Sequence, residues 1–258
     1  MTTHVESPTN TRIVAAARLK KRRRRTTSGM FLIEGTRETR RALSAGTTIA
    51  EAFLCRAYAN AQTETVAEEL VEAGIQLTTT SAQAFDKLSV RQHPDGIVAV
   101  APTWDPSFEQ MTGDLTLAAE SIEKPGNLGA MFRTADAAGA GLLIADPNVD
   151  PFNPNVLRAS QGALFSVPFV LTDADTAIEW ALRRGSLFVA TPDAQVELWD
   201  VDLTGMTTVV VGSERDGVSE AWRRAGSPIR IPMAGLADSL NASVSAAVVL
   251  YEVVRQRR

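Results

Sequence analysis

Three turns of this sequence carry the polar side chains that could do chemistry. The first lies in residues 124–141, where Pro125 and Gly126 form a tight turn before a helix of small residues. Asn127 stands at the mouth of that turn, and Arg133 follows on the helix. An arginine among small apolar residues costs free energy unless its guanidinium reaches a partner. Arg133 is therefore either a solvent-exposed helix residue or part of a site.

The other two turns follow expected strands in the C-terminal half of the chain. Residues 212–217 contain Glu214, and residues 231–241 contain Ser239 and Asn241. Each turn also has a purely structural explanation, since Ser239 can cap the following helix and the earlier turn can simply join a strand to a helix. Together, the three turns supply one carboxylate, one serine, two amides and one arginine. That set suits a neutral or cationic cofactor and a group transfer in which orientation provides most of the catalysis.

The composition excludes several other kinds of site. Two histidines and a single cysteine, Cys55, are too few for a Cys/His zinc site or an internal disulfide, so we expect no metal. A G-x-G-x-x-G fingerprint and a P-loop lysine motif are both absent. A Ser-His-acid set is not credible, because His4 is near the terminus and His93 lies beside a proline in a turn. The longest apolar runs fall well short of the ~20 residues that a membrane span needs.

Basic residues are concentrated at the N-terminus. The net charge is −4, but residues 1–41 hold eleven Lys and Arg against three acids, whereas the remainder holds fifteen against twenty-seven. A nuclear signal or a solvated charge run would look the same, and an export signal is excluded because the next apolar run ends at Glu34. We expect this segment to bind a nucleic acid through four consecutive arginines, Arg22, Arg23, Arg24 and Arg25.

Alternating strand and helix patterns divide the chain into two α/β units. After a frayed start over residues 1–10, the first unit has expected strands at residues 30–33, 49–54, 75–79 and 97–100. Residues 101–110 contain two prolines and are predicted to be a linker. The expected domains are therefore residues 1–105 and residues 106–258.

The second unit places the polar turns at the ends of strands. Strands are expected at residues 115–119, 142–145, 167–171, 187–191, 207–211 and 229–231. Ligands of α/β sheets bind at such strand ends, so we expect the three turns to share one edge of the sheet. A final helix over residues 239–255 carries an apolar face, which is typical of a core or an interface and consists of Leu240, Val244, Val248 and Tyr251.

The three turns resemble the three motifs of the SpoU (TrmH) family of RNA ribose 2′-O-methyltransferases, in the SPOUT superfamily. The matching residues are 125–135, 212–218 and 231–243, in the family's order and spacing. Through Asn10, the basic helix and residues 29–35, the first unit is similar to the ribosomal-protein-like substrate-binding domain that many members carry. The departures from the family pattern remove no motif residue; they are Glu120, Glu123, Lys124, Ala242 and Ser245.

This resemblance implies a fold and a cofactor. Family members have an α/β sheet whose C-terminal segment is threaded into a trefoil knot, which here would involve the second and third motifs and the final helix. S-adenosylmethionine binds in that knot and is held largely by backbone groups. The matching positions in this sequence are Ala190, Thr191, Gly212, Ile231, Met233 and Leu240.

The resemblance also implies catalytic roles. Arg133 matches the family's essential arginine, Asn127 would position that arginine or the ribose, and Glu214, Ser239 and Asn241 would complete the site. A ribose hydroxyl is a poor nucleophile and needs activation. Because an arginine is not ordinarily deprotonated, we expect Arg133 to orient the hydroxyl and stabilise its alkoxide, while a phosphate or water takes the proton.

The expected activity is methylation of a ribose 2′-hydroxyl in RNA in the cytoplasm, with 23S rRNA favoured and tRNA as the alternative. Arg158 is a candidate RNA contact. Since family members are homodimers, the apolar face of the final helix is expected to meet a second copy. The competing interpretation is a non-catalytic RNA-binding or ribosome-assembly dimer, which would bind no S-adenosylmethionine. The residues do not distinguish antibiotic resistance from housekeeping modification.

Overall fold

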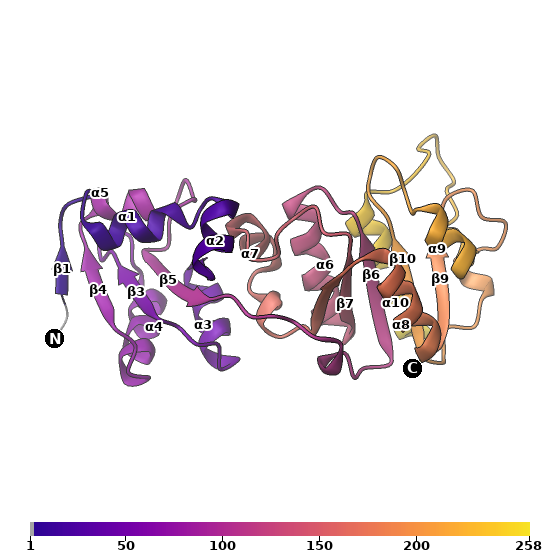
Figure 1. Cartoon of the computed structure of the whole chain (residues 1–258), viewed down its shortest axis with the longest axis horizontal. Helices are drawn as coiled ribbons and strands as arrows, with labels where there is room; N and C mark the ends of the chain where they lie inside the picture. The colour runs from indigo at the N-terminus through magenta and orange to yellow at the C-terminus, as the bar shows by residue number, and fades with distance from the viewer. Residues whose placement is uncertain (1–2) are drawn as a thin grey trace. The chain divides into compact units, whose positions relative to one another are not determined.

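The structure is a computed structural model that describes residues 3–258, and its chain forms two compact units (Figure 1). Unit 1 contains the residues up to Trp104 together with Asp150–Ser166. Unit 2 contains Asp105–Val149 and Val167–Arg258. Each unit has one sheet covered by helices, which confirms the expected α/β class.

Unit 1 is built on a mixed five-stranded sheet in the order β1-β4-β3-β5-β2. Strand β5 runs antiparallel to both of its neighbours, and the other pairs are parallel. Helices α1 and α5 pack together on one face of this sheet, and α3 and α4 pack together on the other (Figure 1). The elements are β1 (Thr3–Val5), α1 (Thr11–Arg18), α2 (Arg22–Ser28), β2 (Met30–Glu34), α3 (Thr36–Ser44), β3 (Glu51–Leu54), α4 (Ala61–Glu72), β4 (Leu77–Thr80), α5 (Ala82–Leu88) and β5 (Ile97–Pro102).

The expectation of a frayed N-terminus is wrong for the residues that form β1. Strand β1 pairs in parallel with β4, and Val5 is buried in the core between the sheet and α1. The His4 imidazole Nδ1 lies 3.0 Å from the Thr79 hydroxyl oxygen. An edge strand has unpaired backbone groups that readily form hydrogen bonds with a further strand. The Thr/Ser-rich composition of the N-terminal residues does not reveal that they pair in this way.

Residues 150–166 form part of unit 1, although they lie in the sequence between strands of unit 2. They contain α7 (Pro154–Ser160) and the 3-10 helix η2 (Ala163–Phe165). The ring of Phe152 lies 4.9 Å from that of Phe31 and 4.7 Å from that of Trp104, measured between centroids. These aromatic contacts hold the segment against β2 and against the residues that follow β5. The sequence predicts this segment to be part of the second domain, and the domain ranges stay a prediction. Contacts between segments so far apart in the chain leave no local pattern.

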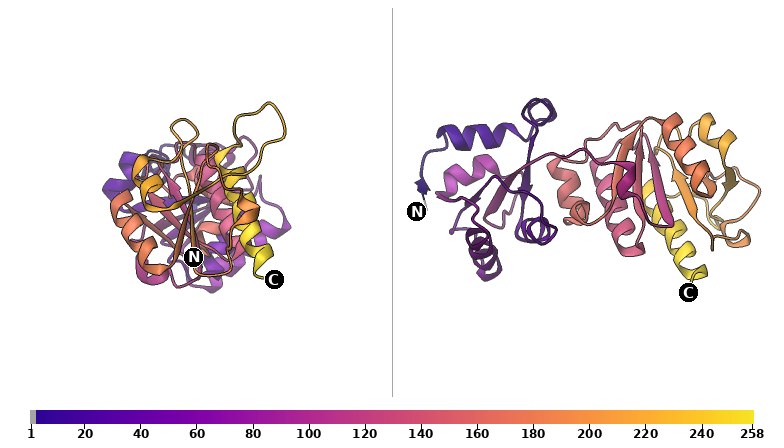
Figure 2. Two further views of the ribbon diagram at one scale, coloured as in Figure 1. Left: turned by 90° about the vertical axis from the view of Figure 1, so that its right-hand side faces the viewer. Right: turned by 60° about the horizontal axis from the view of Figure 1, so that its bottom comes forward.

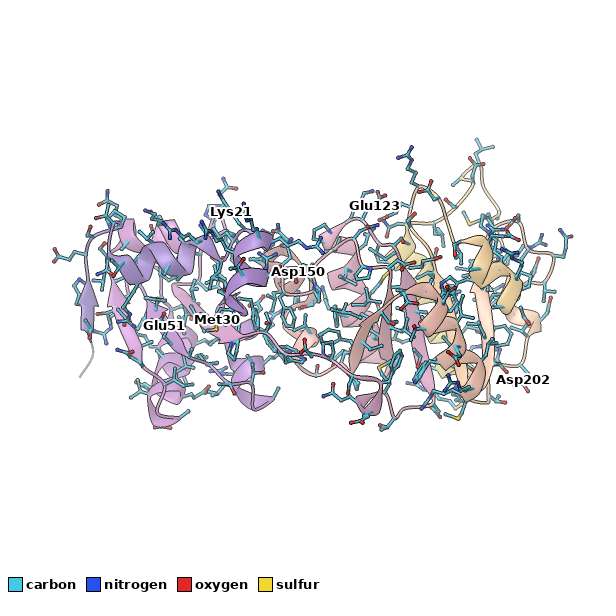
Figure 3. The ribbon with its side chains drawn as sticks, in the orientation of Figure 1. Lys21, Met30, Glu51, Glu123, Asp150 and Asp202 are labelled. Carbon is cyan, nitrogen blue, oxygen red and sulfur yellow. The ribbon has the colours of Figure 1, made fainter. Side chains whose placement is uncertain are left out.

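Arg25 holds the same segment through an ion pair. Its side chain is only 2% exposed, and its guanidinium Nη2 lies 2.6 Å from a carboxylate oxygen of Asp150, which is labelled in Figure 3. The guanidinium also donates to the backbone carbonyls of Leu19 and Lys20. A helix turns by about 100° per residue, so when one side of a helix is packed against the protein, four consecutive residues include one that faces inward. Arg25 is therefore a structural residue, in contrast to the expectation that it binds RNA.

Unit 2 contains a fully parallel six-stranded sheet in the order β11-β9-β10-β6-β7-β8. Helices α6 and α10 pack together on one face, and α8 and α9 pack together on the other (Figure 2). The knot that the resemblance implies stays a prediction. The elements are β6 (Leu115–Glu120), α6 (Pro125–Ala138), β7 (Gly141–Ala145), β8 (Phe169–Thr172), α8 (Ala174–Arg184), β9 (Ser186–Ala190), β10 (Thr207–Val211), α9 (Glu220–Ala225), β11 (Ser227–Ile229) and α10 (Ala242–Gln256).

The strand order of unit 2 determines where the polar turns lie. From β6 the chain proceeds to β7 and β8 on one side, and it later returns to place β10 against the other side of β6. Such a reversal of strand order is where open α/β sheets bind their ligands. The carboxylate of Glu120, at the end of β6, accepts a hydrogen bond of 2.8 Å from the backbone N–H of Ser219, which follows the β10 turn. The first two motifs therefore start from neighbouring strand ends.

No helix within residues 3–258 combines the length and the apolar character that crossing a membrane requires.

We predict that Asp150→Asn destabilises unit 1 by about 3 kcal/mol, because it leaves the buried Arg25 charge without a counter-charge. Urea unfolding followed by circular dichroism measures this cost. The matched control is Glu51→Gln, which removes the carboxylate from a half-buried pair with Arg12 and should cost less than about 1 kcal/mol. Equal costs for the two variants would contradict the structural role of Arg25.

Candidate functional site

A cavity of about 310 Å³ opens at the carboxyl ends of β9 and β10 in unit 2. Its volume lies at the lower end of the range of about 300–1,000 Å³ for small-molecule sites. Its lining includes every position that the resemblance assigned to the cofactor, namely Ala190, Thr191, Gly212, Ile231, Met233 and Leu240. Glu214 and Ser239 also line it, so the second and third turns meet at one place.

The turn after β10 folds back on itself around Gly212. A β-carbon on Gly212 would lie 2.0 Å from the carbonyl oxygen of Gly217 and 2.4 Å from the backbone nitrogen of Val218. The turn is closed by a hydrogen bond of 3.1 Å from the Gly217 N–H to the Ser213 carbonyl, and Gly217 has a φ of +67°. Only glycine fits at position 212, and the bare backbone there forms part of the cavity wall.

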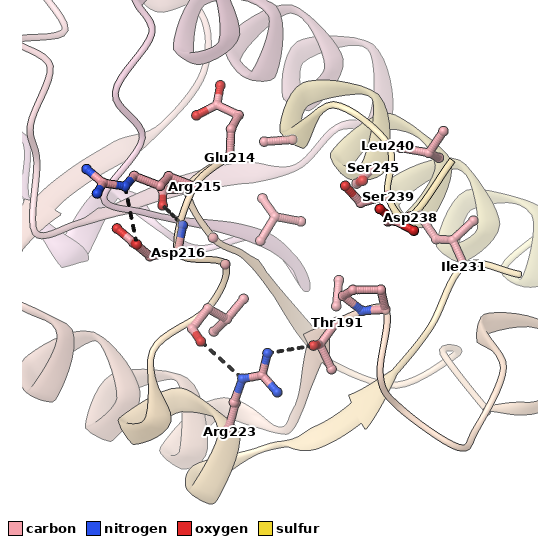
Figure 4. A pocket seen from close by; sticks show the side chains of 18 of the residues that line it. Thr191, Glu214, Arg215, Asp216, Arg223, Ile231, Asp238, Ser239, Leu240 and Ser245 are labelled. Carbon is pink, nitrogen blue, oxygen red and sulfur yellow. Dashed lines mark hydrogen bonds and ion pairs between the residues drawn. The ribbon is translucent and has the colours of Figure 1, made fainter. Parts of the chain in front are cut away.

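One residue of the cavity lining, Glu214, has a carboxylate without a hydrogen-bond partner, and this carboxylate points away from Thr191 and Ile231 (Figure 4). Both carboxylate oxygens of Glu214 are buried, and neither has a partner among the described residues. The side of the cavity opposite Arg223 is formed by Asp238, Ser239 and Leu240 (Figure 4). Because an isolated buried carboxylate is costly, its oxygens are expected to meet a donor or a cation when a ligand is present.

Arg223 joins the loops that form the cavity. From α9 its guanidinium donates to the Thr191 hydroxyl at 2.8 Å (Figure 4) and to the Val218 carbonyl at 3.1 Å. It also donates to the Asp193 carboxylate at 2.8 Å. The Thr191 hydroxyl and then the Arg223 guanidinium hold the pKa of Asp193 below its usual range. The loop after β9 and the turn after β10 are thus fixed to each other by one side chain.

The last helix begins later than the sequence predicts, and the residue that precedes it links the third motif to the first. Asn241, rather than Ser239, caps α10, since its side-chain oxygen accepts from the backbone N–H of Ser243 at 3.0 Å. The amide nitrogen of Asn241 donates to the side-chain oxygen of Asn127 at 3.3 Å. The Asn127 amide nitrogen is buried and has no partner in the described part of the chain. One asparagine therefore caps the helix and contacts the first motif.

Helix α6 presents Arg133 to the solvent. The helix starts with Pro125 in its first turn and ends at Gly139, whose φ is +68°, as its sequence predicts. Arg133 is exposed, does not line the cavity, and forms no ion pair with a residue in 3–258. The structure thus joins Asn127, Glu214, Ser239 and Asn241 to the cavity or its rim, but not Arg133.

The expected RNA-binding residues lie in unit 1. Arg22, Arg23 and Arg24 are exposed on α2, and Arg158 is exposed on α7. Within the described residues, no group of three or more His, Cys, Asp or Glu side chains could hold a metal ion.

Sequence reasoning missed Arg223 and Asp238, which also line the cavity. Arg223 is one of two adjacent arginines on α9, and only the fold distinguishes it from Arg224, which is 74% exposed. Asp238 directly precedes the third motif, and its acidic character beside Ser239 was the one available signal.

Comparison with known families decides what kind of protein carries this cavity. Residues 114–251 match the SpoU rRNA Methylase family, and residues 10–99 match the MRM3-like substrate binding domain. This chain belongs to the SpoU rRNA methylase family. The membership expected from the three motifs is therefore confirmed, and these motifs all fall within the matched C-terminal region.

Individual relatives agree with this membership along nearly the whole chain. The chain is 29% identical to the 23S rRNA (guanosine(2553)-2′-O)-methyltransferase RlmP of Bacillus subtilis, covering 96% of this chain and 98% of the relative. A crystal structure of an RNA 2′-O ribose methyltransferase is 39% identical, covers 99% of both chains and superposes with a TM-score of 0.88. An AdoMet-bound rRNA methyltransferase from Sinorhizobium meliloti is 27% identical, covers 98% of both chains and has the same TM-score of 0.88.

We predict that the two functions of Asn241 can be separated by substitution. Asn241→Ala should lower the free energy of unfolding by about 1 kcal/mol, because α10 loses its N-terminal cap. Asn241→Asp keeps the capping oxygen but cannot donate to Asn127, so stability should be retained while that contact is lost. Urea unfolding measures the first effect, and nitrogen-15 NMR of the Asn127 amide measures the second. An unchanged stability in Asn241→Ala would show that Asn241 does not cap the helix.

Proposed function

We propose that this protein transfers a methyl group from S-adenosylmethionine to a ribose 2′-hydroxyl of RNA, with 23S rRNA as the substrate. The observation that carries the proposal is the single cavity at the ends of β9 and β10, which is lined by all six positions matching the family's cofactor contacts. The relative from Bacillus subtilis, which aligns along 96% of this chain, is named for 2′-O-methylation of 23S rRNA. This favours rRNA over tRNA and therefore a cytoplasmic location.

The residues of the cavity fit S-adenosylmethionine. Gly212 exposes backbone for close approach, and Val211, Ile231 and Leu240 provide aliphatic walls for an adenine ring. Glu214 places a negative charge beside the cavity, which suits a ligand with ammonium and sulfonium charges. When bound, S-adenosylmethionine supplies a methyl group activated by the positive sulfonium.

The polar residues outside the cavity would handle the ribose. A guanidinium stays charged at any pH of interest, so Arg133 would orient the 2′-hydroxyl and stabilise the alkoxide that develops on its oxygen. A phosphate or water then accepts the proton. Asn127 and Asn241, linked by their hydrogen bond of 3.3 Å, would hold the ribose in position, with Ser239 at the cavity. Orientation thus provides most of the catalysis.

A second copy of the chain would complete the site. Val244 is 46% exposed and Tyr251 is 49% exposed on α10, and the partly exposed Val248 lies between them on the same helix face. An apolar face of this kind is typical of a homodimer interface with two-fold symmetry. Arg133 is exposed on α6, which packs against α10, so a ribose bound at the dimer would be within the reach of both helices.

The RNA would be held electrostatically by unit 1. Arg22, Arg23 and Arg24 are exposed on one short helix, and Arg158 is exposed on α7. Contacts from such side chains to phosphates release counterions, so affinity for RNA should fall as salt is added.

The experiment that tests the proposed function is transfer of labelled methyl from S-adenosylmethionine to 23S rRNA. We expect Arg133→Ala to lower kcat at least 100-fold, which is the scale of losing one donor to a developing oxyanion. Cofactor affinity measured by calorimetry should change less than about twofold, since Arg133 does not line the cavity. Arg183→Ala, which also removes an exposed helix arginine, is the control and should keep full activity. Full activity in Arg133→Ala would refute the assigned role.

We predict that Arg223→Met weakens S-adenosylmethionine binding about tenfold, because the two loops around the cavity lose their common anchor. At saturating cofactor, kcat should be retained. Arg224→Met is a matched control on the same helix, since Arg224 is 74% exposed and does not line the cavity. Equal dissociation constants for the two variants, measured by calorimetry, would show that Arg223 does not shape the site.

A further inference from the structure

A second cavity, of about 440 Å³, lies wholly within unit 1. It is formed by the start of α3, by the loop between α5 and β5, and by the end of α7. Its lining is polar throughout and carries more positive than negative groups. The lining residues are Arg37, Glu38, Arg91, Gln92, His93, Asp95, Arg158 and Gln161.

Both carboxylates of this cavity are paired with Arg91, and these three groups together carry one net negative charge. One guanidinium nitrogen of Arg91 lies 2.8 Å from a carboxylate oxygen of Glu38, and another lies 3.0 Å from a carboxylate oxygen of Asp95. Arg91 also donates to the Glu34 carbonyl at 2.9 Å. Burial raises the pKa of Glu38, and the Arg91 guanidinium opposes that rise. Arg91 is therefore a scaffold residue that is committed to both carboxylates.

Arg37 and Arg158 are the cations that remain. The guanidinium of Arg37 donates to the side-chain oxygen of Gln161, which is a neutral partner. Neither Arg37 nor Arg158 forms an ion pair with any carboxylate in residues 3–258, and both side chains are exposed. With three arginines against two carboxylates, the lining has a formal charge of +1, and the two guanidinium groups without carboxylate partners attract an anion. A planar guanidinium matches two oxygens of a phosphate group at once.

The backbone of the α7 terminus holds this arrangement in place. Gln161 has a φ of 53°, a left-handed conformation that costs a non-glycine residue free energy. The next residue, Gly162, has a φ of +85°, and a β-carbon there would lie 3.0 Å from the Arg41 side chain of α3. The end of α7 thus packs closely on α3, and the Gln161 side chain fixes Arg37 beside the cavity.

We propose that this cavity binds one phosphodiester of a single-stranded RNA segment together with its adjoining nucleotide. Arg37 and Arg158 hold the phosphate oxygens, and Gln92, His93 and Gln161 offer hydrogen-bonding groups to the ribose and base edges. The lining has no Phe, Tyr or Trp, and His93 is its one aromatic ring, so charge and hydrogen bonds provide most of the recognition. This inference rests on the proposed function for the identity of the anion, and it adds Arg37 and a defined cavity to the RNA-binding surface.

The test compares two double variants that remove the same charge from the full-length protein. Arg37→Gln with Arg158→Gln removes the two uncommitted cations, whereas Arg56→Gln with Arg183→Gln removes two exposed arginines that are paired elsewhere. Binding of labelled 23S rRNA transcript, without S-adenosylmethionine, is followed by anisotropy over a series of salt concentrations. The slope of log K against log salt should fall in magnitude by about 0.7 in the cavity variant, since the cavity holds one phosphate and each single-strand phosphate contact contributes about 0.7. It should be unchanged in the control.

A third variant, Gln161→Glu, tests the charge of the cavity without removing an arginine. The new carboxylate would neutralise Arg37, so RNA affinity should fall while cofactor binding stays as in the wild type. Gln161→Asn is its uncharged control. A cavity double variant with wild-type affinity and slope would overturn the proposal, even if methyl transfer proceeds. If the wild-type protein transfers no methyl group while the salt slopes of the cavity variant and the control still differ, the proposed function is refuted and the RNA site is supported.

Discussion

The cavity of unit 2 depends on one steric constraint, the absence of space for a β-carbon at Gly212. With the Gly217 carbonyl oxygen 2.0 Å from where that atom would stand, the turn after β10 closes tightly and exposes backbone rather than side chain. The closed turn forms one wall of the cavity, and Arg223 fixes it to the loop after β9. The third motif supplies the opposite wall and continues into α10, whose cap Asn241 contacts the first motif. A parallel sheet whose strand order reverses beside β6 is what brings these separate segments to one edge.

The arginines of this chain differ in function because they differ in their partners. Arg25 is buried against Asp150 and stabilises unit 1, and Arg223 is committed to the loops around the cavity. Arg133 and Arg158, by contrast, are exposed and form no ion pair within the described residues, which leaves their charges available to RNA. Sequence position alone does not separate these cases, since the residues before Arg25 are arginines as well. An arginine whose guanidinium has no ion-pair partner in the fold indicates a binding role better than its position in the sequence does.

Local patterns predicted most of the helices and strands, because apolar periodicity and glycine stops are local properties of the chain. The end of α6 at Gly139 is an example. The cavity lining was predictable from the three motifs through their resemblance to a family, and not from composition. Strand β1 was missed because its pairing with β4 depends on an open sheet edge, which leaves no trace in its own residues. The assignment of residues 150–166 to unit 1, and the burial of Arg25, follow from contacts between segments far apart in the chain.

The central claim is that the cavity of unit 2 serves methylation of a ribose 2′-hydroxyl in RNA. Its most direct test is mapping of 2′-O-methyl groups in unmodified 23S rRNA after incubation with this protein and S-adenosylmethionine. We expect a new 2′-O-methyl group at a single nucleotide, and none when the cofactor is omitted. Methylation on a base, or no methylation of rRNA by protein that binds the cofactor, would contradict this claim.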